Sequence, residues 1–202
     1  MRFWSSPLYS TAAAAADVAI NSRYTAGFIW LTGHNMNSIN YLAGYPEHIQ
    51  QQASGLLQSG RLSSYLAEKY PAVHQVQSDK ALYGYVNELK NSYMRNTPSL
   101  SQVRYDSKLN VIKQALGMHT FASRVQGNKL KAHNSISIAA LFKQAPEAFL
   151  RMIVVHELAH FKEKDHNKAF YKLCQHMEPA YHQLELDTRL WLLWRALNKA
   201  EC

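Results

Sequence analysis

The chain has 202 residues, which suits one domain with a short extension and allows a sizeable buried core. Hydrophobic residues make up 47% of it, which excludes a disordered chain, and because no run of 18 apolar residues occurs we expect no membrane span. The formal net charge is +8, a balance that favours polyanionic partners or substrates, although no motif points to nucleic acid. The two cysteines, Cys174 and Cys202, do not suggest a disulfide framework, so we expect a cytoplasmic protein.

The first 35 residues differ in character from the rest. The stretch Thr11–Ile20 is mostly alanine, and the polar residues around it leave no apolar core for a signal peptide. We expect residues 1–35 to be an extension, either a weak alanine-rich helix or a disordered tail, with Met36 as an alternative start of the protein. The expected folded domain then covers residues 36–202.

Helices are expected in the first half of this domain. Proline at the first turn and glycine at the end indicate a helix between Pro46 and Gly60, and a shorter one follows over Arg61–Lys69. Ser78 is a suitable N-cap for a helix over Asp79–Arg95, in which apolar residues recur at spacings of three and four.

The pattern changes to short β-prone runs between about residues 102 and 142. Three runs are expected to form strands: Val103–Tyr105, Thr120–Val125 and Ser135–Ala139. Gln126-Gly127-Asn128 is a turn signal between the second and third of these runs, while Leu109–Leu116 is open between strand and helix. We therefore predict a small antiparallel sheet.

The helix that follows is expected to be buried. Pro146 occupies its first turn, and apolar side chains surround it almost completely over Phe149–Ala159. Two further helices are expected over about Asn167–Met177 and Ala180–Asn198. These elements together predict an α+β fold in which helices flank the small sheet.

The buried helix carries the sequence His156-Glu157-Leu158-Ala159-His160. A spacing of four puts both imidazoles on one face, with Cβ atoms roughly 5–6 Å apart, so that two ring nitrogens can meet at one zinc ion. Glu157 can then reach a water at the metal and accept its proton as general base. This is the HExxH pattern of zinc hydrolases. Two ordinary core histidines would leave a buried Glu157 carboxylate without an explanation.

A third ligand is needed to complete such a site. His166 is the leading candidate, because the polar run Lys162–Asp165 lets the helix end and the chain turn back. Glu163 stands where metzincins with the same spacing have a glycine. Glu178 is the alternative, since other zinc peptidases take a carboxylate from a later helix. Zinc is the expected metal, although three histidines also bind other divalent ions.

The run Arg151–Tyr171, which contains the motif and His166, resembles the YgjP-like metallopeptidase-domain family. Further segments that carry the resemblance are Asp79–Tyr83, Met177–Tyr181 and Asp187–Trp191, so that it covers about residues 36–195. The core of that family is similar to the helix-and-sheet core of the Wss/SprT-like zinc proteases. The resemblance therefore implies a zincin-like core within the α+β fold.

The resemblance also bears on the site and on the activity. It implies that His156, His160 and His166 bind zinc. Many relatives carry a Trp-Gly-Ser-Cys element before the motif helix, whereas this chain has Ser123–Gly127 there, which leaves the substrate open. The family is named for metallopeptidases, and some members are described as slow UTP pyrophosphatases. The resemblance thus implies either a peptide or a nucleotide as substrate.

Other residues are candidates for contact with the substrate. Arg124, Lys129 and Lys131 lie in the expected hairpin before the motif helix, where cations can flank an extended peptide or hold phosphates. Tyr171 and Tyr181 are candidate donors to an oxyanion. Three functions remain open: peptide hydrolysis as the leading hypothesis, pyrophosphohydrolysis of UTP, and a non-enzymatic zinc-stabilised module that binds nucleic acid or protein.

Overall fold

The computed structural model describes residues 41–42, 44–109, 117–126 and 129–199, all within one compact unit, Ile39–Cys202. Residues 117–126 and 129–133 are described by their backbone alone. The expected extension over residues 1–35 and nearly all of Leu109–Leu116 lie outside the described residues. The boundary between extension and domain therefore stays a prediction.

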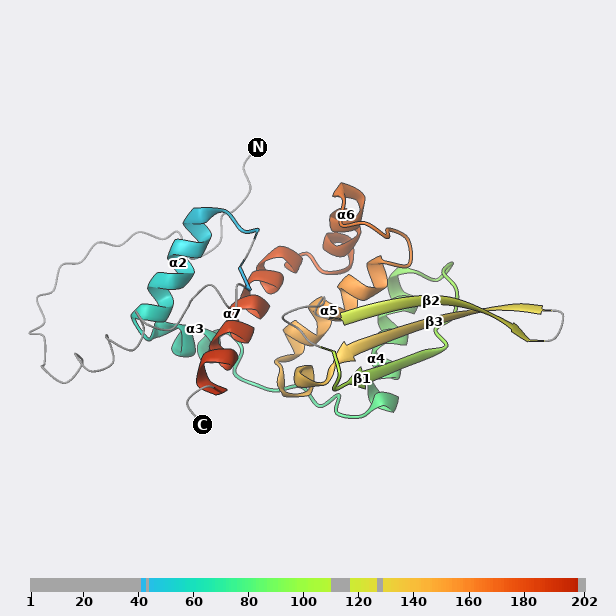
Figure 1. Ribbon diagram of the computed structural model, residues 1–202, viewed down its shortest axis with the longest axis horizontal. Helices are drawn as coiled ribbons and strands as arrows, with labels where there is room; N and C mark the ends of the chain where they lie inside the picture. Colours follow the sequence, from blue (N-terminus) through green and yellow to red (C-terminus); the bar gives the residue numbers. More distant parts are fainter. Residues whose placement is uncertain (1–40, 43, 110–116, 127–128, 200–202) are drawn as a thin grey trace, which may run out of the picture. The chain divides into compact units, whose positions relative to one another are not determined.

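Six α-helices and one short 3-10 helix lie within the described residues (Figure 1). They are α2 (Glu47–Gln58), α3 (Arg61–Lys69), α4 (Asp79–Tyr93), η3 (Ala140–Gln144), α5 (Glu147–Ala159), α6 (Lys168–Met177) and α7 (Tyr181–Lys199). Each α-helix predicted from the sequence is confirmed to within a few residues. Within this part of the chain, none of the helices has both the length and the hydrophobicity that crossing a bilayer needs.

Local side-chain signals determine where several helices begin. The hydroxyl of Ser78 accepts a hydrogen bond from the backbone N–H of Ala81 and so caps α4. The side chain of Asn167 caps α6 in the same way, accepting from two backbone N–H groups of the first turn. Gly60 separates α2 from α3 in a left-handed conformation, with φ of 67°, that suits a residue without a side chain.

The sheet has three strands, β1 (Gln102–Asp106), β2 (Gly117–Gln126) and β3 (Lys129–Ala139), in the order β1-β3-β2. β2 and β3 form an antiparallel hairpin, but β1 pairs parallel with β3 (Figure 1). The predicted antiparallel sheet is therefore wrong for β1, and the sheet is mixed. The short connection between β2 and β3 makes these two strands antiparallel. The longer connection between β1 and β2 lets β2 pair with the edge of β3 that faces away from β1.

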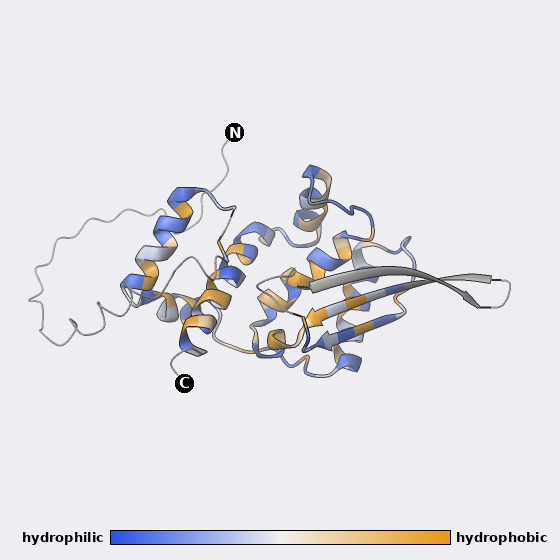
Figure 2. Cartoon of the chain, viewed as in Figure 1, coloured by the Kyte–Doolittle hydropathy of each residue, from blue (hydrophilic) through white to orange (hydrophobic). Residues whose placement is uncertain are grey.

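Helix α5 lies in the hydrophobic core, where it packs against β2, β3, α4, α6 and α7. Nine of its thirteen residues are buried, and Figure 2 shows it in predominantly hydrophobic colours. β3 contributes the fully buried Ile136 and Ile138 to the same core. A helix enclosed on all sides is a rigid support for the side chains at its C-terminal end.

A buried polar network joins α3 to α7. Asp187 of α7 is fully buried, and its carboxylate accepts hydrogen bonds from the hydroxyls of Tyr65 and Tyr70 at 3.0 and 2.6 Å. Lys69 adds an ion pair at 2.7 Å, and the side-chain amide of Gln183 donates at 3.0 Å. A buried carboxylate with this many donors is well compensated for the loss of water.

Candidate metal centre

Two histidines lie at the C-terminal end of α5. His156 is in the last turn of the helix, and His160 is the residue that caps it. The chain then turns through residues 161–165, and Asn167 begins the next helix. This turn brings His166 back to the two motif histidines.

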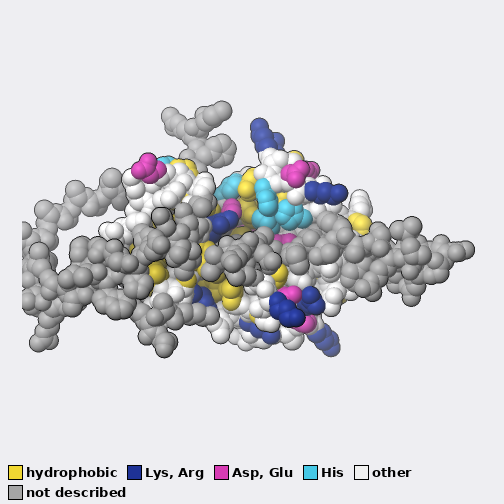
Figure 3. Space-filling model, viewed as in Figure 1, with side chains coloured by type: hydrophobic (Ala, Val, Ile, Leu, Met, Phe, Trp, Pro, Cys, Tyr) yellow, Lys and Arg dark blue, Asp and Glu magenta, His cyan; other side chains and the backbone are white. Residues whose placement is uncertain are grey.

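The three histidines form a compact group. Their ligand nitrogens all lie within 4.8 Å of one another, and the Nε2 atoms of His156 and His166 are 3.1 Å apart. Two nitrogen ligands of a tetrahedral zinc ion, each at about 2.0–2.1 Å, are about 3.3 Å apart, so the spacing fits a metal ion. The fully buried Phe170 packs against all three rings at centroid distances of 4.7–5.0 Å. Figure 3 shows histidine side chains gathered between α6 and α7.

Each motif histidine has a partner at its other ring nitrogen. Nδ1 of His160 lies 3.0 Å from the backbone carbonyl oxygen of Glu163. A carbonyl only accepts, so this nitrogen carries the proton and Nε2 keeps its lone pair for a metal. Nδ1 of His156 lies 2.7 Å from the hydroxyl of Tyr181. Glu163, at the position of the metzincin glycine, therefore contributes a backbone contact to the site.

The environment keeps two of the histidines neutral. Burial, together with the charges of His160, His166 and Arg189, lowers the pKa of His156 to about 3. The pKa of His166 is also lowered, mainly by burial and then by the charge of His160. Neutral imidazoles offer lone pairs, which is the form that binds a metal ion.

Glu157 follows His156 on α5 and is buried. It is 1% exposed, and its Oε1 atom has no hydrogen-bond partner among the described residues. Burial raises the pKa of this carboxyl group to about 8. A buried carboxyl oxygen without a partner is unfavourable. The residues present therefore fit a site that is completed by a group from outside the chain, such as a metal ion with its water.

The comparisons with known proteins agree with this geometry. The model of the family described as "YgjP-like, metallopeptidase domain" matches residues 37–189. The chain belongs to this family. A UTP pyrophosphatase of Escherichia coli (strain K12) is 56% identical to the YgjP-like chain over 164 residues, which are 81% of this chain and 98% of that protein. No solved structure is significantly similar to the YgjP-like chain.

Fold class and reaction class follow from this membership. The YgjP-like chain is an α+β protein with a zincin-like core, as the sequence predicted. It is a metal-dependent hydrolase, not the non-enzymatic module considered as an alternative. The group His156, His160 and His166 is suited to hold the metal ion.

Glu178, the alternative third ligand, has other partners in the YgjP-like structure. Its Oε2 atom forms an ion pair with Nε of Arg151 at 2.6 Å. Its Oε1 atom accepts a hydrogen bond from the backbone N–H of Ala180. Arg151 also donates to the carbonyl oxygen of Met177. Both oxygens of Glu178 are therefore engaged at the junction of α6 and α7, and the compact group contains His166 instead.

The predicted basic contacts of the YgjP-like chain lie on the hairpin. Arg124 of β2 is paired with Lys131 of β3, and Lys129 is paired with Gln126. This part of β3 lies beyond the residues that pair with β1, which begin at Ser135. Because only the backbone is described here, contacts of these side chains with a substrate stay predictions.

The two predicted tyrosines lie at the site in different ways. Tyr171 is half-buried, and its ring centroid is 6.5 Å from that of His166, so it remains a candidate for contact with a substrate. Tyr181 is fully buried, and its hydroxyl contacts His156. The structure thus gives the Tyr181 hydroxyl a histidine as its partner, and a contact of Tyr181 with the substrate stays a prediction.

A charged pair on α7 was not predicted from the sequence. Nη2 of Arg189 lies 3.1 Å from Oε1 of Glu185, and its guanidinium lies 5.7 Å from the ring centroid of Tyr45. Burial and the charge of His160 are the largest causes of the lowered pKa of His166. Glu185 acts to raise this pKa and Arg189 acts to lower it, so both charges of the pair act at the histidine group. Tyr181, Glu185 and Arg189 recur every four residues, a spacing that places them on one face of a helix.

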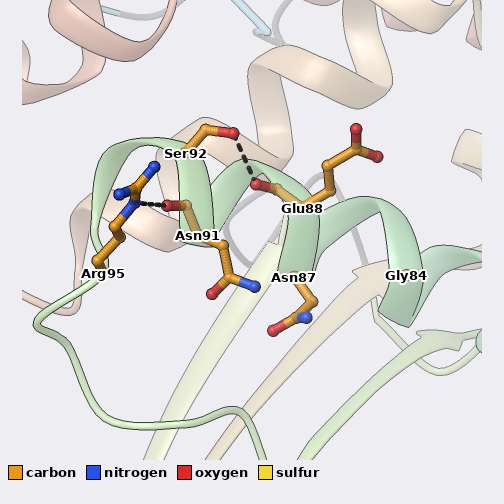
Figure 4. Close-up of a pocket in the computed structure, with 6 residues that line it drawn as sticks. All are labelled: Gly84, Asn87, Glu88, Asn91, Ser92 and Arg95. Carbon is orange, nitrogen blue, oxygen red and sulfur yellow. Dashed lines mark hydrogen bonds between the residues drawn. The ribbon is translucent and has the colours of Figure 1, made fainter.

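A further hollow, of about 570 Å³, lies on α4 (Figure 4). It is lined by Gly84, Asn87, Glu88, Asn91, Ser92 and Arg95. The Ser92 hydroxyl and the Arg95 Nε atom both donate to backbone carbonyls of the same helix. The histidine group does not line this hollow, which offers only polar side chains of a helix surface.

Proposed function

We propose that this YgjP-like hydrolase uses a zinc ion, held by His156, His160 and His166, to hydrolyse UTP to UMP and diphosphate. The observation that supports UTP as the substrate is the 56% identity to a UTP pyrophosphatase over 98% of that protein's length. The proposal for the metal is supported by three ligand nitrogens within 4.8 Å of one another.

Zinc is proposed because a set of three histidines is typical of the catalytic sites of this ion. When bound, the ion supplies Lewis-acid chemistry, which lowers the pKa of water and offsets negative charge on the oxygens of the substrate. His166 is the exposed member of the three, whereas His156 and His160 are half-buried. A substrate is therefore expected to approach the group from the side of His166.

Glu157 is the proposed general base. Its unpartnered Oε1 atom and its pKa of about 8 support a role in proton transfer near neutral pH. In the proposed reaction its carboxylate takes a proton from the attacking water, whose oxygen bonds to the α-phosphorus of UTP. The bond from that phosphorus to the bridging oxygen then breaks, and diphosphate leaves with the electron pair.

Arg189, which is paired with Glu185, is a proposed contact for the triphosphate of the substrate. The field of Arg189 acts on His156 and His166, and its side chain is 30% exposed. Guanidinium groups form strong charge-assisted hydrogen bonds with phosphate oxygens. Tyr171, beside His166, is a further proposed contact. The cationic side chains of Arg124, Lys129 and Lys131 in the β2–β3 hairpin are further proposed contacts for the negative charge of the substrate.

Peptide hydrolysis is the second candidate. The description of the family as a metallopeptidase domain favours it. β2 lies at an edge of the sheet and packs against α5, so an extended peptide could pair with this strand by β-augmentation. In that reaction Glu157 would deprotonate the same water, which would attack a carbonyl carbon.

The test compares the wild-type protein with Glu157→Gln, both loaded with stoichiometric zinc. We expect the wild type to release diphosphate from UTP, and Glu157→Gln to keep its zinc but lose about 10²–10⁴-fold in kcat, because the amide cannot accept the proton. Glu147→Gln is the matched control, since it makes the same change at an exposed position of the same helix.

The outcomes separate the two substrates. If the zinc-loaded wild type releases no diphosphate but cleaves unfolded peptides, and Glu157→Gln abolishes that cleavage, the substrate is a peptide. If Glu157→Gln turns over UTP as fast as the wild type, Glu157 is not the base.

A further inference from the structure

The hydroxyl of Tyr181 lies where three helices meet. Tyr181 is the first residue of α7, and its side chain is 0% exposed. Its oxygen lies 2.7 Å from Nδ1 of His156 on α5, and it also interacts with the thiol of the buried Cys174 on α6. The contacts of this hydroxyl that the structure shows are with protein groups, and its role is inferred from them.

The two motif histidines differ in what determines their tautomers. The partner of His160 is a carbonyl oxygen, which can only accept, so Nδ1 of that ring must carry the proton. The partner of His156 is a hydroxyl, which can either donate or accept. If the Tyr181 hydroxyl donated to Nδ1, the ring proton would lie on Nε2. The nitrogen that faces His166 at 3.1 Å could then not bind a metal ion.

The surroundings of the hydroxyl favour the accepting orientation. The sulfur of Cys174 can accept the hydroxyl proton, and the O–H group of a tyrosine is a stronger donor than a thiol. When the hydroxyl points to the sulfur, it presents only oxygen lone pairs to His156. Nδ1 then donates to the tyrosine oxygen, and the lone pair of Nε2 faces the other two histidines.

The start of α7 is itself held against α5. The backbone N–H of Tyr181 donates to the carbonyl oxygen of Glu178 at 2.9 Å. Glu178 is in turn paired at 2.6 Å with Arg151, which lies five residues before His156 on the same helix. Helix α5 therefore carries His156 and also holds the start of α7, which carries Tyr181. This fixes the position of the Tyr181 hydroxyl.

We propose that Tyr181 is a positioning residue of the metal centre, whose hydroxyl accepts the Nδ1 proton of His156 and so keeps Nε2 free to bind the ion. The inference rests on the proposed metal site, but it does not depend on which substrate is hydrolysed. Hydrogen-bond partners of ligating histidines typically contribute about 10–100-fold to metal affinity. Tyr181 is expected to contribute within that range.

The variant Tyr181→Phe removes the hydroxyl and keeps the ring. We expect its zinc affinity to be about 10–100-fold lower than that of the wild type, measured by competition with a chromophoric chelator at pH 7. Long-range 1H–15N spectra of the metal-free protein should show His156 as the Nδ1–H tautomer in the wild type and partly as Nε2–H in the variant. The spectrum of His156→Gln identifies the resonances of this ring.

Tyr70→Phe is the matched control. It removes another tyrosine hydroxyl with a short hydrogen bond, 2.6 Å to Asp187, from the α3–α7 junction. We expect it to lower the melting temperature without changing zinc affinity or the tautomer of His156. A general loss of stability and a specific loss of positioning are thereby distinguished.

Either of two results would overturn the proposal. One is an Nε2–H tautomer of His156 in the metal-free wild type, a measurement that needs no variant and still decides if Tyr181→Phe does not fold. The other is a Tyr181→Phe protein with unchanged zinc affinity and an unchanged tautomer. If zinc affinity falls as expected but UTP is not hydrolysed, the UTP proposal fails and the positioning role stands.

Discussion

His166 is the one member of the histidine group that comes from a loop. It follows the turn after α5, and it is exposed while the other two histidines are half-buried. Its Nε2 atom nevertheless lies 3.1 Å from that of His156, and Phe170 packs against its ring. At the scale of single residues, the proposed third ligand thus depends on a short polar turn and on the Asn167 cap that ends it.

The choice of third ligand is testable with two variants. Loss of a hydrogen-bond partner of a ligating histidine typically lowers metal affinity about 10–100-fold. His166→Ala should lower zinc affinity by more than that, because it removes a ligand itself. Glu178→Gln should lower it far less, since both oxygens of Glu178 are bonded to Arg151 and Ala180. Chelator competition measures both affinities. Losses of equal size would contradict the choice of His166 over Glu178.

At the scale of elements, the Asp187 carboxylate links α7 to α3. Asp187 is fully buried and collects hydrogen bonds from Tyr65, Tyr70 and Lys69, all on or next to α3. The same helix starts with Tyr181, so its placement also affects the histidine group.

Loss of this carboxylate should destabilise the whole fold. Asp187→Ala leaves two tyrosine hydroxyls and the Lys69 charge without their acceptor, and we expect the free energy of unfolding to fall by about 3 kcal/mol. Urea unfolding followed by circular dichroism measures the change. Glu68→Ala, an exposed change on α3, should stay within about 0.5 kcal/mol. A similarly small effect of Asp187→Ala would mean that the junction contributes little.

At the scale of the whole molecule, several tyrosines are held in protonated form by burial. Burial is the largest cause of the raised pKa values of Tyr45, Tyr70 and Tyr105. Burial and then the charge of Glu147 raise the pKa of Tyr85 to about 12, against the opposing effect of Arg151. These residues lie in the connection before α2, after α3, in α4 and in β1, so the effect is distributed over the fold.

This distribution predicts a loss of stability at high pH. Above about pH 10 the unfolded chain releases its tyrosine protons, while the folded protein keeps them until higher pH. The unfolded state then binds fewer protons than the folded state, so the free energy of unfolding falls as pH rises. Urea unfolding at pH 8 and pH 11 measures the fall, and Tyr85→Phe should reduce it. Equal stability at both pH values would contradict the prediction.

The sequence alone determined the features that depend on neighbours along the chain. Helix ends follow from caps such as Ser78 and Asn167, and the pairing of His156 with His160 follows from one turn of helix. The apolar run around Glu157 correctly predicted that its carboxylate is buried. These signals act over three or four residues, so no knowledge of packing is needed to interpret them.

The tertiary structure decided the features that depend on distant residues. Alternation marks strands but not their neighbours, so the parallel pairing of β1 with β3 was missed. Glu178 is paired with Arg151, 27 positions away, and Tyr181 contacts His156, 25 positions away. Arg189 acts at the histidine group from the middle of α7. Such contacts arise from how helices pack, and because many packings are compatible with the same local pattern, only the folded chain selects among them.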